Sequence, residues 1–124
     1  MFSAAIVSSR NETASQLEAC LQQTGIVASI RRWSFSPVPI GRGEAIPDVV
    51  ILDVSRDAES RLAVAAQLRA LRSNILILAW SPSQQPTAEL VLDAMRRGVR
   101  DFLPPAFDTA ALRDFLARAV RQAR

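Results

Sequence analysis

Few side chains in this sequence are able to carry out chemistry. The chain contains no histidine and no tyrosine, its fifteen basic residues are all arginine, and Cys20 is the single cysteine. The absence of histidine removes the imidazole base, and the absence of lysine removes Schiff-base and P-loop chemistry. Carboxylates, hydroxyls and one thiol remain. We therefore expect the protein not to be an enzyme and to bind no cofactor.

Asp53 is the carboxylate whose position is most informative. It comes directly after the apolar run Val49–Leu52, which has the length of a buried strand. In parallel α/β sheets, functional crevices lie at the carboxyl ends of strands, where the strand order reverses. Asp53 is therefore the first candidate for a functional group.

Apolar runs of strand length alternate with segments of helical period along the chain. The expected strands are Ala4–Val7, Ile26–Ile30, Val49–Leu52, Ile75–Trp80 and Asp101–Leu103. The expected helices are Asn11–Thr24, Ala58–Arg72, Pro86–Arg97 and a last one that begins at Asp108. This alternation predicts one α/β domain over residues 1–124, with a doubly wound, five-stranded parallel sheet. Cys20 lies in the apolar stripe of its helix, so we expect its thiol to be buried.

The second helix of this pattern is expected to be short or absent. The helix breakers in the segment that follows the second strand are Pro37, Pro39, Gly41, Gly43 and Pro47. We expect the apolar residues Trp33, Phe35, Val38 and Ile40 to cover the sheet where a crossover helix would otherwise lie. The alternative is an exposed apolar patch that binds a partner.

Composition limits the location of the protein. Hydrophobic residues make up 49% of the chain, and no apolar run is long enough to span a membrane. The first residues lack the basic and long apolar parts of a signal peptide. We expect a cytoplasmic protein without a membrane span.

The positive charge is unevenly distributed. The formal net charge of +3 divides into −1 over residues 1–62 and +4 over residues 63–124. Much of the excess lies near the C-terminus, in Arg113, Arg118, Arg121 and Arg124. No aromatic residue interleaves these arginines after Phe115, so we expect a solvated helical face and no nucleic-acid binding.

Two motifs resemble the receiver domain of bacterial response regulators. Pro47–Asp53 (PDVVILD) is similar to the third strand of that domain, and Gly98–Leu103 with Ala106–Phe107 is similar to its fifth strand and the following turn. The resemblance extends over the whole chain. It implies a flavodoxin-like (CheY-like) sheet with the strand order 2-1-3-4-5.

The resemblance also implies a site that has lost most of its chemistry. Receivers transfer a phosphoryl group to the aspartate that Asp53 matches, with a magnesium ion held by that aspartate and an acidic pair after the first strand. The other family positions fall on Ser8 and Ser9 for the acidic pair, Ala79 for the hydroxyl residue and Pro105 for the lysine. Two hydroxyls are poor replacements for carboxylates as magnesium ligands. We therefore expect no metal site and a pseudo-receiver without phosphotransfer.

Several roles for Asp53 remain open. It accepts hydrogen bonds from backbone amides or caps the turn into the Ala58 helix. Alternatively, it pairs with Arg10, whose guanidinium would take the place of the metal. A third possibility is a phosphorylatable two-component response regulator that uses Asp53 as the acceptor. A further alternative is a small-molecule-binding role at the Asp53 crevice, which we expect Trp80 to narrow.

A closer resemblance concerns the C-terminal third of the chain. Gly98–Ala119 is similar to the atypical N-terminal receiver domain of tight-adherence (Flp) pilus-assembly proteins of the TadZ or CpaE type. That resemblance implies pilus-assembly components as partners and an ATPase domain that follows in the chain.

Many receivers dimerise through their fourth helix, fifth strand and fifth helix. In this chain that face would carry charges of both signs on Asp93, Arg97, Arg100, Asp101, Arg113 and Arg118. A twofold axis would bring arginines near aspartates, around an apolar centre formed by Leu90, Met95 or Ala117. We expect a constitutive homodimer. The alternative is that these charges are the solvated sides of two amphipathic helices.

Overall fold

The computed structural model describes residues 2–8, 11–33, 47–55, 58–71, 75–81, 86–103 and 109–122. Its strands are β1 (Phe2–Val7), β2 (Val27–Trp33), β3 (Val49–Asp53), β4 (Leu76–Trp80) and β5 (Asp101–Phe102). Its helices are α1 (Asn11–Thr24), α2 (Ala58–Leu71), α3 (Ala88–Arg96) and α4 (Thr109–Gln122). None of the helices in these ranges is long and apolar enough to cross a membrane.

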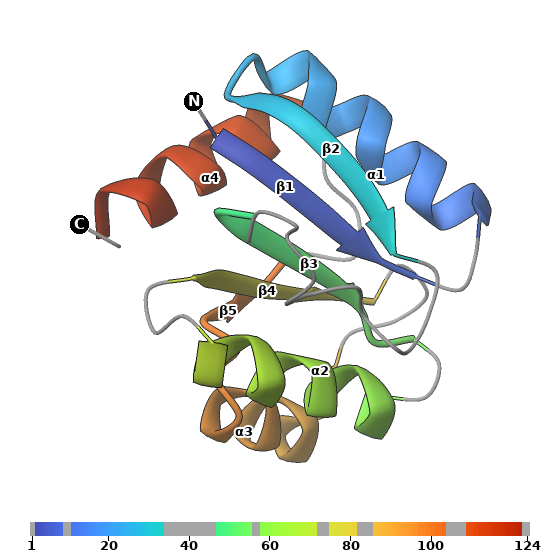
Figure 1. The fold of residues 1–124 in the computed structure, drawn as a ribbon, viewed down its shortest axis with the longest axis vertical. Coiled ribbons are helices and arrows are strands. Elements are labelled where there is room, and N and C mark those ends of the chain that lie inside the picture. Colours follow the sequence, from blue (N-terminus) through green and yellow to red (C-terminus); the bar gives the residue numbers. More distant parts are fainter. Residues whose placement is uncertain are drawn as a thin grey trace.

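The five strands form one parallel sheet in the order β2-β1-β3-β4-β5. Helices α1 and α4 cover one face of the sheet, and α2 and α3 cover the other (Figure 1). The predicted fold class and strand order are therefore confirmed. The segment in which a second helix was expected to be short or absent, residues 34–46, lies outside the described residues.

The central strands β3 and β4 are buried on both faces of the sheet, which explains why they are aliphatic. Every residue of β3 and β4 is buried. Side chains alternate along a strand, so Val49 and Ile51 pack beneath α1 and α4 while Val50 and Leu52 pack beneath α2. The amphipathic helices supply the matching apolar stripes, such as Leu17 and Leu21 on α1.

Strand β2 is longer than its apolar run indicates. It continues through Arg31 and Arg32 and ends at Trp33. The prediction that Trp33 belongs to the covering segment was therefore wrong, because Trp33 pairs with Val7 as the last residue of β2, and its ring packs into the core beneath α2 from that strand. The other three apolar residues of that prediction, Phe35, Val38 and Ile40, lie outside the described residues.

Two further local details differ from expectation. Cys20 is half-buried and lies against the core beneath α1 and α4, whereas we expected a fully buried thiol. Helix α3 begins two residues later than predicted, at Ala88, because Thr87 is its N-cap and accepts a hydrogen bond from the Leu90 amide at 3.1 Å.

Candidate functional site

Asp53 ends β3, and both oxygens of its carboxylate accept hydrogen bonds from the protein. The Ser8 hydroxyl donates to Oδ2 at 2.9 Å. The Ser55 amide and hydroxyl donate to Oδ1 at 3.0 and 2.5 Å. Asp53 lies at the carboxyl edge of the sheet, yet only 4% of its surface is exposed. Three neutral donors therefore satisfy the hydrogen-bonding needs of this buried carboxylate, and no cation from the described part of the chain binds it.

The parallel register brings these groups together. Val7 of β1 pairs with Leu52 of β3, so Ser8 and Asp53 follow their strands side by side. Ser8 is buried, and its amide donates to the Trp33 carbonyl at 3.2 Å, which holds the end of β1 on β2. Ser55 lies two residues after Asp53, the spacing at which an aspartate accepts the amide of its own turn. The hydrogen bond from the Ser55 amide agrees with the first role considered for Asp53, in which its carboxylate accepts backbone amides of the turn after β3.

A magnesium ion does not fit this arrangement. The fold family holds the metal with carboxylates, whereas the residue directly after β1 is the neutral Ser8, whose hydroxyl donates to Asp53. Within the described residues, no three Asp, Glu, Cys or His side chains come together as a metal-binding group. The described residues around Asp53 therefore do not match the carboxylate set of the family's metal site.

At the end of β4, the position that carries a hydroxyl in the family is occupied by Ala79, and the next hydroxyl in the chain is that of the buried Ser81, two residues later. Ala79 and Trp80 are both buried, with Ala79 in the core beneath α2 and Trp80 in the core beneath α1 and α4. Trp80 pairs with Asp53 in the register of β3 and β4, and its carbonyl accepts the Val54 amide at 2.9 Å. The large ring thus fills the interior next to the site.

Three predicted site residues, Ser9, Arg10 and Pro105, lie outside the described residues. The pairing of Arg10 with Asp53 and the replacement of the family's lysine by Pro105 therefore stay predictions. Ser55, which the sequence patterns did not indicate, is the functional neighbour that they missed.

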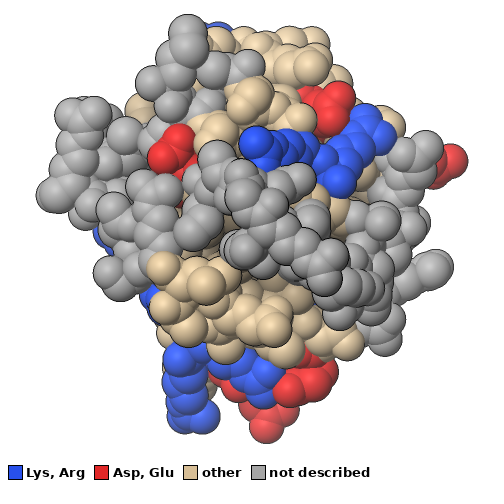
Figure 2. Space-filling model, in the orientation of Figure 1, with Lys and Arg blue, Asp and Glu red and all other residues tan. Residues whose placement is uncertain are grey.

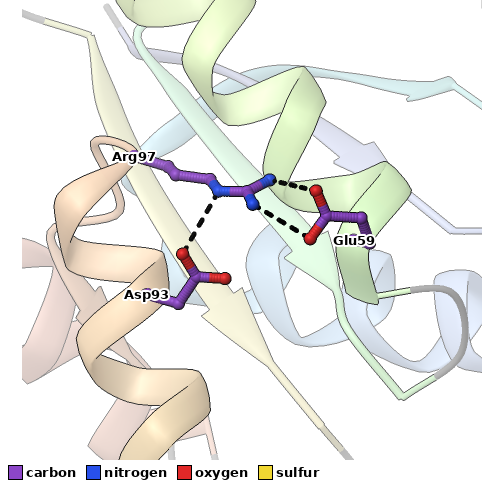
Figure 3. Close-up of polar contacts among 3 residues, drawn as sticks. All are labelled: Glu59, Asp93 and Arg97. Atoms are coloured by element: carbon purple, nitrogen blue, oxygen red, sulfur yellow. Dashed lines mark hydrogen bonds and ion pairs between the residues drawn. The ribbon is translucent and has the colours of Figure 1, made fainter.

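Asp93, Arg97 and Arg113, three of the six residues expected on the dimer face, bind residues of other helices or of their own helix. Arg97 binds Glu59 of α2 through two nitrogens, at 2.8 and 3.0 Å, and its Nε lies 3.3 Å from Asp93 (Figure 3). The hydrogen bond to Glu59 is the main reason why the pKa of Arg97 is raised. Arg113 donates to the carbonyls of Thr24 and Gln23 at 3.1 and 3.4 Å, so it fastens α4 to the end of α1.

The other three residues are exposed and accompany an apolar surface. Arg100, Asp101 and Arg118 are exposed, and the Asp101 carboxylate accepts the Phe102 amide at 2.8 Å. On α3, Leu92 is 56% exposed and Met95 is 47% exposed, whereas Leu90 packs against the core. Figure 2 shows arginines beside acidic side chains at the lower end of the molecule, where Figure 1 places α2 and α3.

Leu92 was not among the residues expected at this face. The helical stripe predicted from the sequence contains Leu90, Val91, Ala94 and Met95 and does not include Leu92. Its exposure becomes evident once Ala94 is known to point at the sheet, because Leu92 then lies about 160° round the helix from Ala94.

The strand order, the helices on both faces and an aspartate at the end of β3 define the receiver fold, the CheY-like form of the flavodoxin fold. The pilus assembly protein cpaE from Burkholderia thailandensis E264 has this fold, with a TM-score of 0.82 and 23% identity over 98% of this chain and 99% of that one. A pilus assembly-related protein from Burkholderia pseudomallei K96243 gives 0.76 and 24% identity, covering 98% and 91%.

Response regulators are similar to the same extent. DrrB from Thermotoga maritima, an OmpR/PhoB homologue, gives a TM-score of 0.79 and 18% identity, covering 100% of this chain and 54% of that one. No protein-family model matches the chain, and no curated protein matches it in sequence. The structural neighbours thus include receiver domains of both kinds, and at these identities they establish the fold.

Proposed function

We propose that this chain is a pseudo-receiver, a protein-interaction domain that self-associates and does not accept a phosphoryl group. The observation that carries the proposal is the hydrogen bonding of Asp53. Both carboxylate oxygens are held by Ser8 and Ser55, and the residue is almost completely buried. The site is a closed structural junction between β1, β3 and the turn that leads to α2.

The missing partners of the reaction support the same conclusion. Phosphoryl transfer depends on groups that position the phosphoryl and neutralise the charge that develops on its oxygens. Here Ala79 has no hydroxyl, the chain contains no lysine, and Ser8 offers a hydroxyl where the family has an acid. Attack by Asp53 would also require access to an oxygen of a residue that is almost completely buried and hydrogen-bonded to Ser8 and Ser55. The domain is accordingly not an enzyme.

The surface of α3, β5 and α4 is the proposed site of self-association, and we call it the α3-β5-α4 face. Its apolar centre is formed by Leu92 and Met95, and its charged border by Arg100, Asp101 and Arg118. Adjacent charges of opposite sign permit a surface to complement itself across a twofold axis. The depletion of charge at the centre is typical of protein interfaces.

Pilus assembly is the proposed setting. Two similar structures are of pilus assembly proteins, cpaE among them, and they match this chain over almost its full length. We infer a cytoplasmic domain of a pilus-assembly protein, with pilus components or a following ATPase domain as protein partners. The competing function is a phosphorylatable response regulator that uses Asp53, because response regulators are equally similar in fold.

The acceptor reaction decides between these two functions. We expect that acetyl phosphate with magnesium leaves the intact mass of the protein unchanged, and that beryllofluoride with magnesium leaves its tryptophan fluorescence unchanged. The reason is that Asp53 is almost completely buried with hydrogen bonds to both of its oxygens, and that its described neighbour after β1 is Ser8 and not a carboxylate that could hold magnesium. A stoichiometric phosphoryl adduct that disappears in Asp53→Asn would contradict the proposal and favour the response-regulator function.

The charged residues at the border of the α3-β5-α4 face provide a second test, which concerns only the self-association. We expect the dimer to weaken as salt rises, because exposed charge pairs are screened. Asp101→Arg and Arg118→Asp should each weaken it by about fivefold, and the double variant should recover part of that loss. Sedimentation equilibrium at micromolar concentrations measures both effects. Indifference of the dimer to either single reversal would place the interface elsewhere.

A further inference from the structure

A second polar cluster, which does not include Asp53, connects α3 to α2. Arg97 directly follows α3 and reaches across to the first turn of α2, where it binds both oxygens of Glu59. Its Nε also lies 3.3 Å from Asp93, one turn earlier on α3 (Figure 3). Two parallel nitrogen–oxygen contacts fix the direction of a guanidinium as well as its position.

A second arginine connects the other end of α2 to the turn that follows α3. Arg69, near the end of α2, donates to the carbonyl of Gly98. Gly98 has a φ of +106°, and a Cβ at this position would lie 3.0 Å from Arg69 Nε and 3.3 Å from Arg69 Cβ. Glycine is therefore required both by the backbone conformation and by the close approach of Arg69. Burial of Arg69, with the nearby charge of Arg100, lowers the pKa of Arg69.

The two connections span the length of α2. Glu59 and Arg69 are ten residues apart, about 15 Å along the helix, while their contacts on the other side are the adjacent residues Arg97 and Gly98. The turn between α3 and β5 is thus held from both ends of α2, and it is less free to tilt or rotate than with a single contact.

The apolar surface lies on the opposite side of α3. Met95 is two residues from both Asp93 and Arg97, which places it about 200° round the helix from each of them. Leu92 is about 140° from Arg97. The contacts with α2 therefore set the orientation in which Leu92 and Met95 are presented.

We propose that Arg97 is a positioning residue, which orders α3 on α2 so that the α3-β5-α4 face is formed before any partner binds. This inference rests on the proposed self-association for its purpose, and on the Glu59 and Gly98 contacts for its geometry. A surface that is ordered in advance loses less conformational entropy on association. No phosphoryl-dependent movement is then needed to create it.

Amide hydrogen exchange tests the inference on the dilute chain. The amides of Arg97, Gly98 and Val99 donate to carbonyls of α3, so their exchange reports opening of this turn. We expect Arg97→Gln, and separately Glu59→Gln, to accelerate their exchange about fivefold. Arg96→Gln removes the same charge from the neighbouring exposed residue and should change it less than twofold.

Dimerisation, measured in parallel, separates this inference from the proposed function. The expected result is that Arg97→Gln weakens the dimer by a similar factor. A chain that is monomeric at every concentration would end the proposed self-association, while faster exchange in Arg97→Gln would still support the ordering of α3. Unchanged exchange in Arg97→Gln, or equal acceleration in Arg96→Gln, would overturn the positioning role whatever the oligomeric state.

Discussion

Replacement of Asp53 by alanine is expected to lower the free energy of unfolding by about 3 kcal/mol. The change removes a buried carboxylate and leaves the Ser8 hydroxyl and the Ser55 amide and hydroxyl without their acceptor. Buried donors that lose their partner retain the cost of leaving water. Urea denaturation monitored by tryptophan fluorescence gives the free energy, and an unchanged m-value shows that the comparison is valid.

A double-mutant cycle with Ser8→Ala isolates the contact between β1 and β3. Because Ser8 donates to an ionised group, we expect a coupling energy of about 2 kcal/mol. Asp114→Ala is the matched control, since Asp114 is an exposed aspartate on α4, and its loss should change stability by less than about 0.5 kcal/mol. Stabilisation by Asp53→Ala would contradict the structure, because it would mean that the carboxylate is a strained functional group.

The predicted and observed folds agree for the strands that are buried on both faces, because such strands are continuous apolar runs in the sequence. Val49–Leu52 and Ile75–Trp80 are continuous aliphatic runs because each strand is sandwiched between two layers of helices. Strand β2 is at the edge of the sheet and carries polar residues without cost. The Nε of Arg32 lies 2.9 Å from the Glu18 carboxylate of α1. Because Arg32 is charged, the hydrophobic pattern did not predict the last three residues of β2.

The site was predictable in part. The resemblance to receivers predicted that Ser8 lies near Asp53, and the parallel register of β1 and β3 brings the two residues together. The contribution of Ser55 depends on the conformation of the turn after β3, which apolar periodicity does not specify. The partner of Arg97 depends on the packing of two helices, and several acidic residues were equally plausible partners before the orientation of α3 was known.

Leu92→Asp is expected to raise the dissociation constant of the dimer by about a hundredfold. Leu92 is 56% exposed in the single chain, and in the proposed dimer it lies at the apolar centre of the α3-β5-α4 face. A carboxylate there would have to leave water against an apolar surface with no cation opposite, which is costly. The stability of the monomer should hardly change, because the side chain is mostly in water before association. Sedimentation equilibrium over micromolar concentrations measures the constant.

Leu71→Asp provides the matched control. Leu71 is 54% exposed, has the same side chain and ends α2, outside the α3-β5-α4 face. The same substitution there should change the dissociation constant by less than about threefold, since its carboxylate stays in water in the dimer as well. Equal weakening by the two variants would show that association depends on general surface hydrophobicity. A dimer as tight in Leu92→Asp as in the parent chain would exclude α3 as its centre, because no apolar contact at that position would tolerate a buried charge.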